Sequence, residues 1–461
     1  MKPFVPGKDK EKITPLYIQL YRHIKNEILT GNLAVGEKLP SLRSLSSESG
    51  LSITTSTQAY NQLLTEGYIL SRPQSGYYVA EIPTSSVIPE ESSKGPGPEF
   101  RDYTFDSDGY LHDPESFDFQ KWKKCSSRVF TEYEDLLLFE SDVQGEAALR
   151  FEICKYLYSS RGVTASPGQV VIGAGTQQLT SHLARILTLM GIDLICTEDP
   201  GYTPIQNIFR DMGFGIAKIP VGERGIMIEK LPVNISTAVY VSPANQFPTG
   251  SVMPIGSRYN LLNWAKENGS IILEDDYDSE LRYFGKPVPA LQGLDENNST
   301  VYLGSFSSTL FPAIKISYMI LPPHMAEIFS SIKDDYTQTC SKAEQLTLAL
   351  FMEDGYYYTN IRKLRSLYSQ KLEATVQAFE KYGRDFVEAT NTKSGINITL
   401  DVRTKKSENL LCQDGKDLGI HIKPTQMKVD KEKRSLSFYF NQIPLDRIDF
   451  LIKNLVEMWK K

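Results

Sequence analysis

The chain has 461 residues, of which 41% are hydrophobic and 23% are charged, which is ordinary for a folded protein of two or three domains. The formal net charge of −6 excludes binding to nucleic acid through overall positive charge, so any such binding needs a local surface. The five cysteines and five histidines are dispersed, which predicts no metal site and no disulfide framework.

The first predicted element is an amphipathic helix near the N-terminus. Thr14 is placed to cap it, Pro15 suits its first helical position, and apolar residues recur at positions 16, 20, 24 and 28. Gly31 is expected to end this helix. The helix opens a module that we assign to residues 1–82.

A helix-turn-helix followed by a wing is predicted for the rest of this module. A short helix covers residues 42–49, and a longer helix that Ser52 caps runs to about Glu66 after a glycine turn. Residues 67–70 and 77–79 then favour two strands around a turn. This order is typical of a winged helix.

Several motifs here resemble the winged helix of GntR-type DNA-binding domains: Leu-Pro-Ser-x-Arg at 39–43, Glu-Gly-Tyr at 66–68 and Ser-Gly-Tyr-Tyr-Val at 75–79. The resemblance implies that Arg43 contacts phosphate or a base edge, and that Gly76 lets the wing approach the minor groove. It places the first turn of the third helix in the major groove. The DNA-contacting hydroxyls expected there are Ser52, Thr54, Thr55 and Thr57.

One position weakens the expected DNA surface. Ile53 stands where the resemblance leads us to expect an arginine, so the helix offers hydroxyls and a methyl group with little charge. We therefore expect modest binding to a double-stranded operator, helped strongly by dimerisation. A winged helix used only for protein contacts is the alternative.

A linker and a second domain complete the predicted organisation. Residues 83–103 are rich in Pro, Gly, Ser and Glu without periodicity, which predicts a flexible tether. Residues 104–461 alternate strand-like apolar runs with helical segments, the pattern of an α/β doubly wound sheet. Alternating runs at 396–402 and 436–440 predict a smaller C-terminal α+β lobe.

Two strand ends in this domain carry the candidate chemistry. The apolar run 271–273 stops at Glu-Asp-Asp-Tyr-Asp (274–278), and the run 301–303 stops at Gly-Ser-Phe-Ser (304–307). Ligands collect at the carboxyl ends of strands in open α/β sheets, and small hydroxyl residues suit a phosphate. The pair predicts a site for an aromatic cofactor phosphate. For the acidic segment alone, a helix cap is the alternative.

These segments resemble the pyridoxal-phosphate fold of class I aminotransferases, and more narrowly the MocR-type regulators, which join that fold to a GntR-type domain. The resemblance implies that Asp275 holds the pyridine nitrogen, that Tyr202 stacks on the ring, and that Tyr277 and Asn245 approach the ring oxygen. A carboxylate that keeps the pyridinium protonated makes the ring an electron sink. The other cofactor contacts predicted are Gly175, Thr176, Gln177, Ser305, Ser307 and Lys315.

The chain departs from this family pattern at the positions of the Schiff-base lysine and of the arginine that binds the substrate carboxylate. Ser308 stands at the position of the Schiff-base lysine, and a hydroxyl cannot replace that amine. Lys315 matches the phosphate-binding arginine and is not expected to serve as the nucleophile. Ser437 stands where the family binds the substrate carboxylate with an arginine, and Arg434 faces the other side of that strand unless the register slips.

The whole pattern predicts a transcription regulator that senses a small effector related to pyridoxal phosphate or an amino acid. We expect it to form a homodimer, to bind pyridoxal 5'-phosphate or pyridoxamine phosphate non-covalently if at all, and to lack catalysis because of Ser308. The first residues lack a signal-peptide core and no apolar run could span a membrane, so we expect a cytoplasmic protein without a membrane partner. The alternatives are an active aminotransferase with a DNA-binding appendage, and a regulator of a different metabolite.

Overall fold

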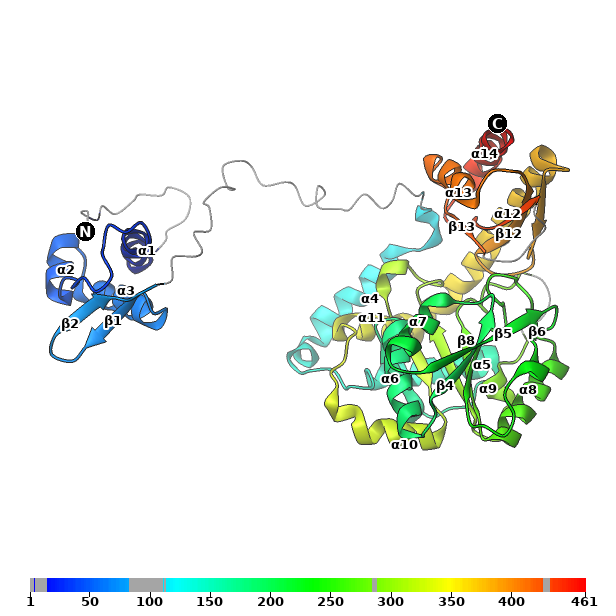
Figure 1. Ribbon diagram of the computed structural model, residues 1–461, viewed down its shortest axis with the longest axis horizontal. Helices are drawn as coiled ribbons and strands as arrows, with labels where there is room; N and C mark the ends of the chain where they lie inside the picture. The colour runs from blue at the N-terminus through cyan, green and yellow to red at the C-terminus, as the bar shows by residue number, and fades with distance from the viewer. Residues whose placement is uncertain (1–3, 5–14, 83–110, 112, 284–287, 426–431) are drawn as a thin grey trace. The chain divides into compact units, whose positions relative to one another are not determined.

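The computed structural model describes residues 4, 15–82, 111, 113–283, 288–425 and 432–461. It divides into two compact units, residues 1–104 and residues 105–461 (Figure 1). Three predicted features lie outside the described residues: the N-cap at Thr14, the linker at 83–103 and the domain start at 104. None of the described helices is long and apolar enough to cross a lipid bilayer.

The first unit is the predicted winged helix. Its elements are α1 (Leu16–Leu29), α2 (Leu42–Ser49), α3 (Ile53–Thr65), β1 (Ile69–Arg72) and β2 (Gly76–Val79). The prediction for Pro15 was wrong by one residue, because Pro15 is the N-cap and α1 begins at Leu16. The carbonyl of Pro15 accepts hydrogen bonds from the backbone N–H groups of Ile18 and Gln19, which closes the first turn.

A small apolar core holds the winged helix together. Leu20 and Ile24 of α1 pack with Leu45 of α2 and with Leu63 of α3, as the helical periodicity predicts. Leu16 was expected on the same face, but it is 45% exposed. The strands β1 and β2 pair antiparallel from Ile69–Val79 to Arg72–Gly76, which confirms the wing.

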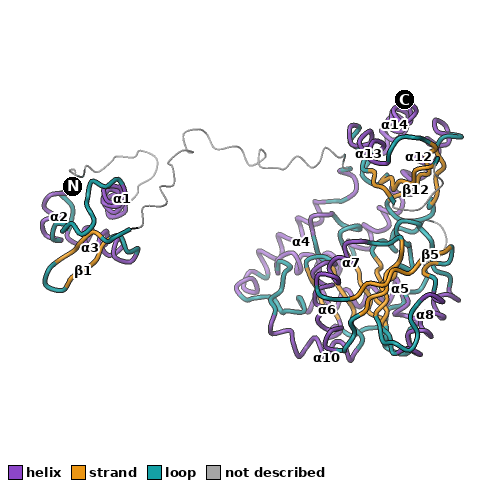
Figure 2. Tube along the Cα trace, in the orientation of Figure 1, coloured by secondary structure: helices purple, strands orange, loops and turns teal. Residues whose placement is uncertain are grey.

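The second unit contains the predicted mixed α/β fold with an eight-stranded sheet (Figure 2). The strands are β3 (Val170–Gly173), β4 (Leu194–Asp199), β5 (Gly215–Gly222), β6 (Gly225–Ile226), β7 (Ala238–Val241), β8 (Ile271–Asp276), β9 (Thr300–Ser305) and β10 (Ser317–Ile320). Their order is β3-β10-β9-β8-β7-β4-β5-β6. The central strands β9, β8, β7, β4 and β5 are parallel, whereas β10 pairs antiparallel with both of its neighbours.

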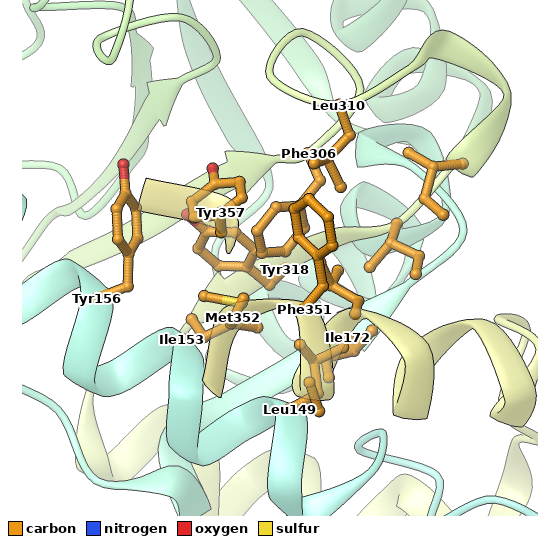
Figure 3. Close-up of a cluster of buried hydrophobic side chains, with 14 of the residues drawn as sticks. Leu149, Ile153, Tyr156, Ile172, Phe306, Leu310, Tyr318, Phe351, Met352 and Tyr357 are labelled. Carbon is orange, nitrogen blue, oxygen red and sulfur yellow. The ribbon is translucent and has the colours of Figure 1, made fainter. Parts of the chain in front are cut away.

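Helices cover both faces of this sheet. They are α4 (Phe119–Glu132), α5 (Ala147–Arg161), α6 (Thr176–Leu189), α7 (Thr203–Asp211), α8 (Ile255–Asn268), α9 (Leu291–Leu294), α10 (Pro323–Ile332) and α11 (Lys342–Glu353). Alternate strand residues face opposite sides. Val171 and Met319 pack in a cluster with residues of α6 and α10. Ile172 and Tyr318 pack in another cluster, with residues of α5 and α11 (Figure 3).

A smaller lobe follows, as predicted. It contains α12 (Tyr356–Gly383), β11 (Val387–Thr390), β12 (Asn397–Arg403), α13 (Glu408–Asp417), β13 (Ile422–Pro424), β14 (Lys433–Tyr439) and α14 (Ile448–Lys460). Its four strands have the order β11-β12-β14-β13 and all pair antiparallel. One buried apolar cluster joins the strands to α12, α13 and α14.

The acidic segment lies inside a strand instead of following it. The predicted run 271–273 is only the first half of β8, whose six residues are all buried through Asp276. Because side chains alternate along a strand, Asp275 lies on the face of Ile271 and Leu273, whereas Glu274 and Asp276 lie on the other face. This alternation divides the three carboxylates between two different roles.

Candidate functional site

A cavity of about 460 Å³ lies at the carboxyl ends of the central strands. Its wall is formed by strands of the eight-stranded sheet, by the N-termini of α6 and α7, and by the smaller C-terminal lobe. The lining residues are Thr176, Gly201, Tyr202, Thr203, Pro204, Ser242, Phe247, Asp275, Tyr277, Ser305, Ser307, Ser308, Ile396, Asn397, Lys423, Pro424, Thr425 and Tyr439. Seven of the predicted site residues, counting Ser308, are among them. The volume is that of a small-molecule site.

Asp275 supplies the carboxylate of the cavity. Burial raises the pKa of Asp275 from 3.8 to about 7, and a hydrogen bond from the hydroxyl of Tyr240 opposes part of that rise. Tyr240 lies on β7, next to β8, and was not predicted. A cationic N–H donor in the cavity would stabilise the charged form of Asp275, which is the role a pyridinium nitrogen would fill.

Tyr202 contributes a partly exposed aromatic ring to the cavity wall. It is the N-cap residue of α7, lines the cavity and is 41% exposed. Phe247 contributes a second aromatic ring to the cavity wall. A flat ring could therefore be held by aromatic side chains together with Asp275.

Hydroxyl groups gather where β9 ends and α6 begins. Ser305, Ser307 and Thr176 line the cavity, and Thr176 is the first residue of α6. Gly175, the N-cap residue, has a φ of +91°, a conformation that favours glycine. The free N–H groups at a helix N-terminus together with side-chain hydroxyls suit a phosphate.

Ser308 is half-buried and lines the same cavity. Its hydroxyl donates a hydrogen bond of 2.6 Å to the carbonyl of Tyr277. The hydroxyl of Tyr277 in turn donates a 2.9 Å hydrogen bond to the carbonyl of Asn245. The position assigned to the Schiff-base lysine thus faces the candidate site, and it presents an oxygen that cannot form an imine.

Four of the predicted contacts are not in the cavity wall: Gly175, Gln177, Asn245 and Lys315. Asn245 is buried and donates a 2.7 Å hydrogen bond to Asp278, so its amide supports the turn that follows β8. Phe247, two residues later, lines the cavity. Lys315 is exposed, with a φ of +50° at the end of a short 3₁₀ turn.

The two residues considered for a carboxylate clamp also stay outside the cavity wall. Arg434 donates hydrogen bonds to the carbonyls of Lys406, at 3.1 Å, and Lys433, at 2.8 Å. Ser437 is fully buried on β14, and its hydroxyl has no hydrogen-bond partner among the described residues. Neither residue presents a cation to the ligand space.

A second buried carboxyl group near Asp275 escaped the prediction. Glu198, on β4, accepts a hydrogen bond of 3.2 Å from Gln246, and burial raises its pKa to about 8. The same Gln246 amide donates to the carbonyl of Pro200, at 2.9 Å. Glu198 was missed because an acidic residue late in a strand does not reveal whether it is exposed.

A buried set of ion pairs supports β8 from the face opposite Asp275. Arg161, at the end of α5, pairs with Asp276 at 2.7 Å, and the hydroxyl of Tyr302 donates to the same carboxylate at 2.7 Å. Glu274 accepts hydrogen bonds from the backbone N–H groups of Leu291 and Gln292. These contacts hold the strand end that carries Asp275.

The predicted DNA-contacting residues lie on the winged helix with different exposures. Arg43 and Thr54 are exposed. Ser52 accepts a hydrogen bond from the backbone N–H of Thr55 and caps α3, and the hydroxyl of Thr57 donates to the carbonyl of Ile53 at 2.8 Å. The hydroxyls of Ser52 and Thr57 therefore serve the helix itself.

The turn of the wing contains Gly76, and the ring of Tyr78 lies close to an arginine beside this turn. Gly76 has a φ of +111°, where a side chain would be strained, so the tight turn between β1 and β2 requires glycine. The guanidinium of Arg72 lies 4.5 Å from the ring centre of Tyr78. This contact keeps a positive charge at the wing.

Comparison with known families agrees with both units. Residues 16–79 match the family described as bacterial regulatory proteins, gntR family, and residues 104–415 match aminotransferase class I and II. The chain is also similar to LysN, an α-aminoadipate aminotransferase from Thermus thermophilus, with a TM-score of 0.65 and 22% identity over 76% of this chain and 90% of that one. That structure shows the shared fold.

Two regulators resemble the chain over most of its length. The HTH-type transcriptional regulator YdeL of Bacillus subtilis is 37% identical over 97% of both chains. The probable rhizopine catabolism regulatory protein MocR of Rhizobium meliloti is 32% identical over 90% of this chain and 87% of its own. The chain therefore belongs to the MocR-type GntR regulators and is a DNA-binding transcriptional regulator with an aminotransferase-like domain.

Proposed function

We propose that residues 105–461 bind a pyridoxal-phosphate-related ligand non-covalently, and that this ligand changes the affinity of a cytoplasmic homodimer for operator DNA. The observation that carries the proposal is Ser308. It lines a cavity with Asp275 and hydroxyl groups suited to a phosphate, yet it provides no amine. A ligand would therefore be bound and sensed without being converted chemically.

The residues of the cavity fit such a ligand. Asp275 would accept the proton-bearing ring nitrogen, and Tyr202 would lie against the ring. Thr176, Ser305 and Ser307 would donate hydrogen bonds to the phosphate. A bound pyridinium ring would supply an electron sink. LysN was crystallised with N-(5'-phosphopyridoxyl)-L-leucine, which supports the ligand class.

The two alternatives are less consistent with the cavity. An active aminotransferase needs an amine at position 308, and the hydroxyl there is already bonded to the carbonyl of Tyr277. A pocket for an unrelated metabolite has no need of a buried carboxylate beside two aromatic side chains. Asp275 and its partner Tyr240 therefore favour a pyridine ligand.

The coupling between ligand and DNA is tested by measuring DNA affinity with and without pyridoxamine 5'-phosphate. The DNA is a fluorescent duplex that the wild-type chain has selected from a random library. Because a ligand shifts an equilibrium only through different affinities for two states, we expect the Kd for DNA to change by about 5–150-fold. Fluorescence anisotropy measures both titrations.

Asp275→Asn provides the control, since it keeps the size of the side chain and removes the charge that pairs with the ring nitrogen. This variant should bind the duplex like the wild type and lose the response to pyridoxamine 5'-phosphate. If calorimetry shows that the wild type binds the ligand while its Kd for DNA stays constant, the proposed coupling is wrong. Absence of ligand binding would refute the proposed ligand class.

A further inference from the structure

The cavity wall contributed by the small lobe contains a lysine that no motif identified. Lys423, on β13, is the only cationic side chain among the described residues that line the cavity, and Asp275 is the only carboxylate among them. Ile396, Asn397 and Tyr439 complete this wall. A ligand that fills the space between the two charges would have a cationic part near Asp275 and an anionic part near Lys423.

Strand register places Lys423 beside Ser437, the position at which the family pattern has an arginine. Lys423 is the direct partner of Ser437 in the antiparallel pair of β13 and β14. Residues directly opposite each other in such a pair project to the same face of the sheet, with the strands roughly 4.8 Å apart. Tyr439, two residues after Ser437 on that face, lines the cavity. The flexible lysine side chain therefore reaches the space from the neighbouring strand.

The ammonium group of Lys423 forms no ion pair with another described residue. No ion pair within residues 15–82, 111, 113–283, 288–425 and 432–461 involves it, whereas Lys433 on the adjacent strand pairs with Glu388 at 3.2 Å. Lys315 is exposed and does not line the cavity, and Arg434 donates hydrogen bonds to backbone carbonyls. Within the described part of the cavity wall, Lys423 is thus the cation available to a ligand.

We propose that Lys423 binds an anionic group of the effector that lies beyond the pyridoxyl ring. Lys423 is one strand away from Ser437. The proposal rests on the proposed function. A lysine is a point charge with rotatable donors, whereas an arginine presents a planar fork that selects carboxylates. The effector class is therefore a pyridoxyl-phosphate adduct of an amino acid or amino acid analogue that carries a carboxylate, a sulfonate or a phosphonate.

Two probes that differ only in the carboxylate test this assignment. They are N-(5'-phosphopyridoxyl)-L-leucine and N-(5'-phosphopyridoxyl)-3-methylbutylamine, titrated calorimetrically into the full chain. A hydrogen bond to a charged group, discounted for an exposed lysine, predicts that the wild type binds the leucine adduct about tenfold more tightly. In Lys423→Met the two affinities should become equal, because only the leucine adduct loses a contact.

Lys416→Met, which removes an exposed charge from α13 in the same lobe, is the matched control and should keep the tenfold preference. Equal affinities in the wild type, or a preference that survives in Lys423→Met, would overturn the role of Lys423 and leave the proposed function standing. If neither adduct binds the wild type, the proposed function fails and this inference fails with it.

Discussion

Replacement of Arg161 by methionine is expected to lower the unfolding free energy of residues 105–461 by about 3–5 kcal/mol. The side chains of Arg161 and Asp276 are only 4% and 1% exposed, and their atoms lie 2.7 Å apart. The variant would leave the Asp276 carboxylate buried with the Tyr302 hydroxyl as its remaining close donor. A buried charge without a countercharge is among the largest single causes of destabilisation.

Urea unfolding followed by tryptophan fluorescence measures this loss. The three tryptophans, Trp122, Trp264 and Trp459, all lie in the second unit, so the signal reports that unit alone. The double variant Arg161→Met/Asp276→Asn should be more stable than the single variant, because it removes the orphaned charge. An unchanged midpoint in Arg161→Met would show that the pair does not support β8.

Replacement of Arg43 by alanine is expected to weaken DNA binding by roughly thirtyfold or more. Arg43 is exposed on α2, and one lost contact costs about 1–3 kcal/mol in each half-site of the proposed dimer. If the contact is to phosphate, the slope of log K against log salt should also become shallower by roughly one unit per subunit. Anisotropy titrations of the selected duplex at several salt concentrations measure both quantities.

Arg22→Ala is the control for this experiment, since it removes an exposed arginine from α1 without touching α2 or the wing. It should keep the affinity of the wild type within a few-fold. Circular dichroism of both variants checks that the winged helix is folded. Wild-type affinity in Arg43→Ala, or an equal loss in both variants, would contradict the assignment of Arg43 to the DNA surface.

Local sequence patterns predicted the fold well because each element carries its own signal. The glycine turn before Ser52, the apolar period of α1 and the alternating runs of the small lobe led to the correct elements, with errors of a few residues at their ends. Pro15 shows the limit. A proline suits both the cap and the first turn of a helix, and the sequence does not separate the two.

The site was predictable where one strand determines it and not where two strands must be paired. The apolar run predicted carboxylates at a strand end, and the family resemblance singled out Asp275 among them. Alternation along β8 then explains why Glu274 and Asp276 lie on the other face. Tyr240 and Lys423 enter the site through the pairing of β7 with β8 and of β13 with β14. No property of either residue in the sequence reveals its neighbour across the sheet.

The difference between Phe247, which lines the cavity, and Asn245, which does not, has a similar origin. The turn at 242–250 is held by side-chain contacts of Gln246 to Glu198 and to the carbonyl of Pro200, which come from another strand and loop. Those contacts decide which residue of the turn faces the cavity. A motif match identifies such a turn but does not determine its orientation.

Borohydride reduction tests most directly whether the cavity holds its ligand without a covalent bond. The purified wild-type chain is incubated with pyridoxal 5'-phosphate, reduced and analysed by intact mass and peptide mapping, with Ser308→Lys in parallel. The cavity of about 460 Å³ has room for the longer side chain. We expect one phosphopyridoxyl group on position 308 of the variant and none on the wild type. A phosphopyridoxyl group on a cavity lysine of the wild type, Lys423 included, would contradict the account.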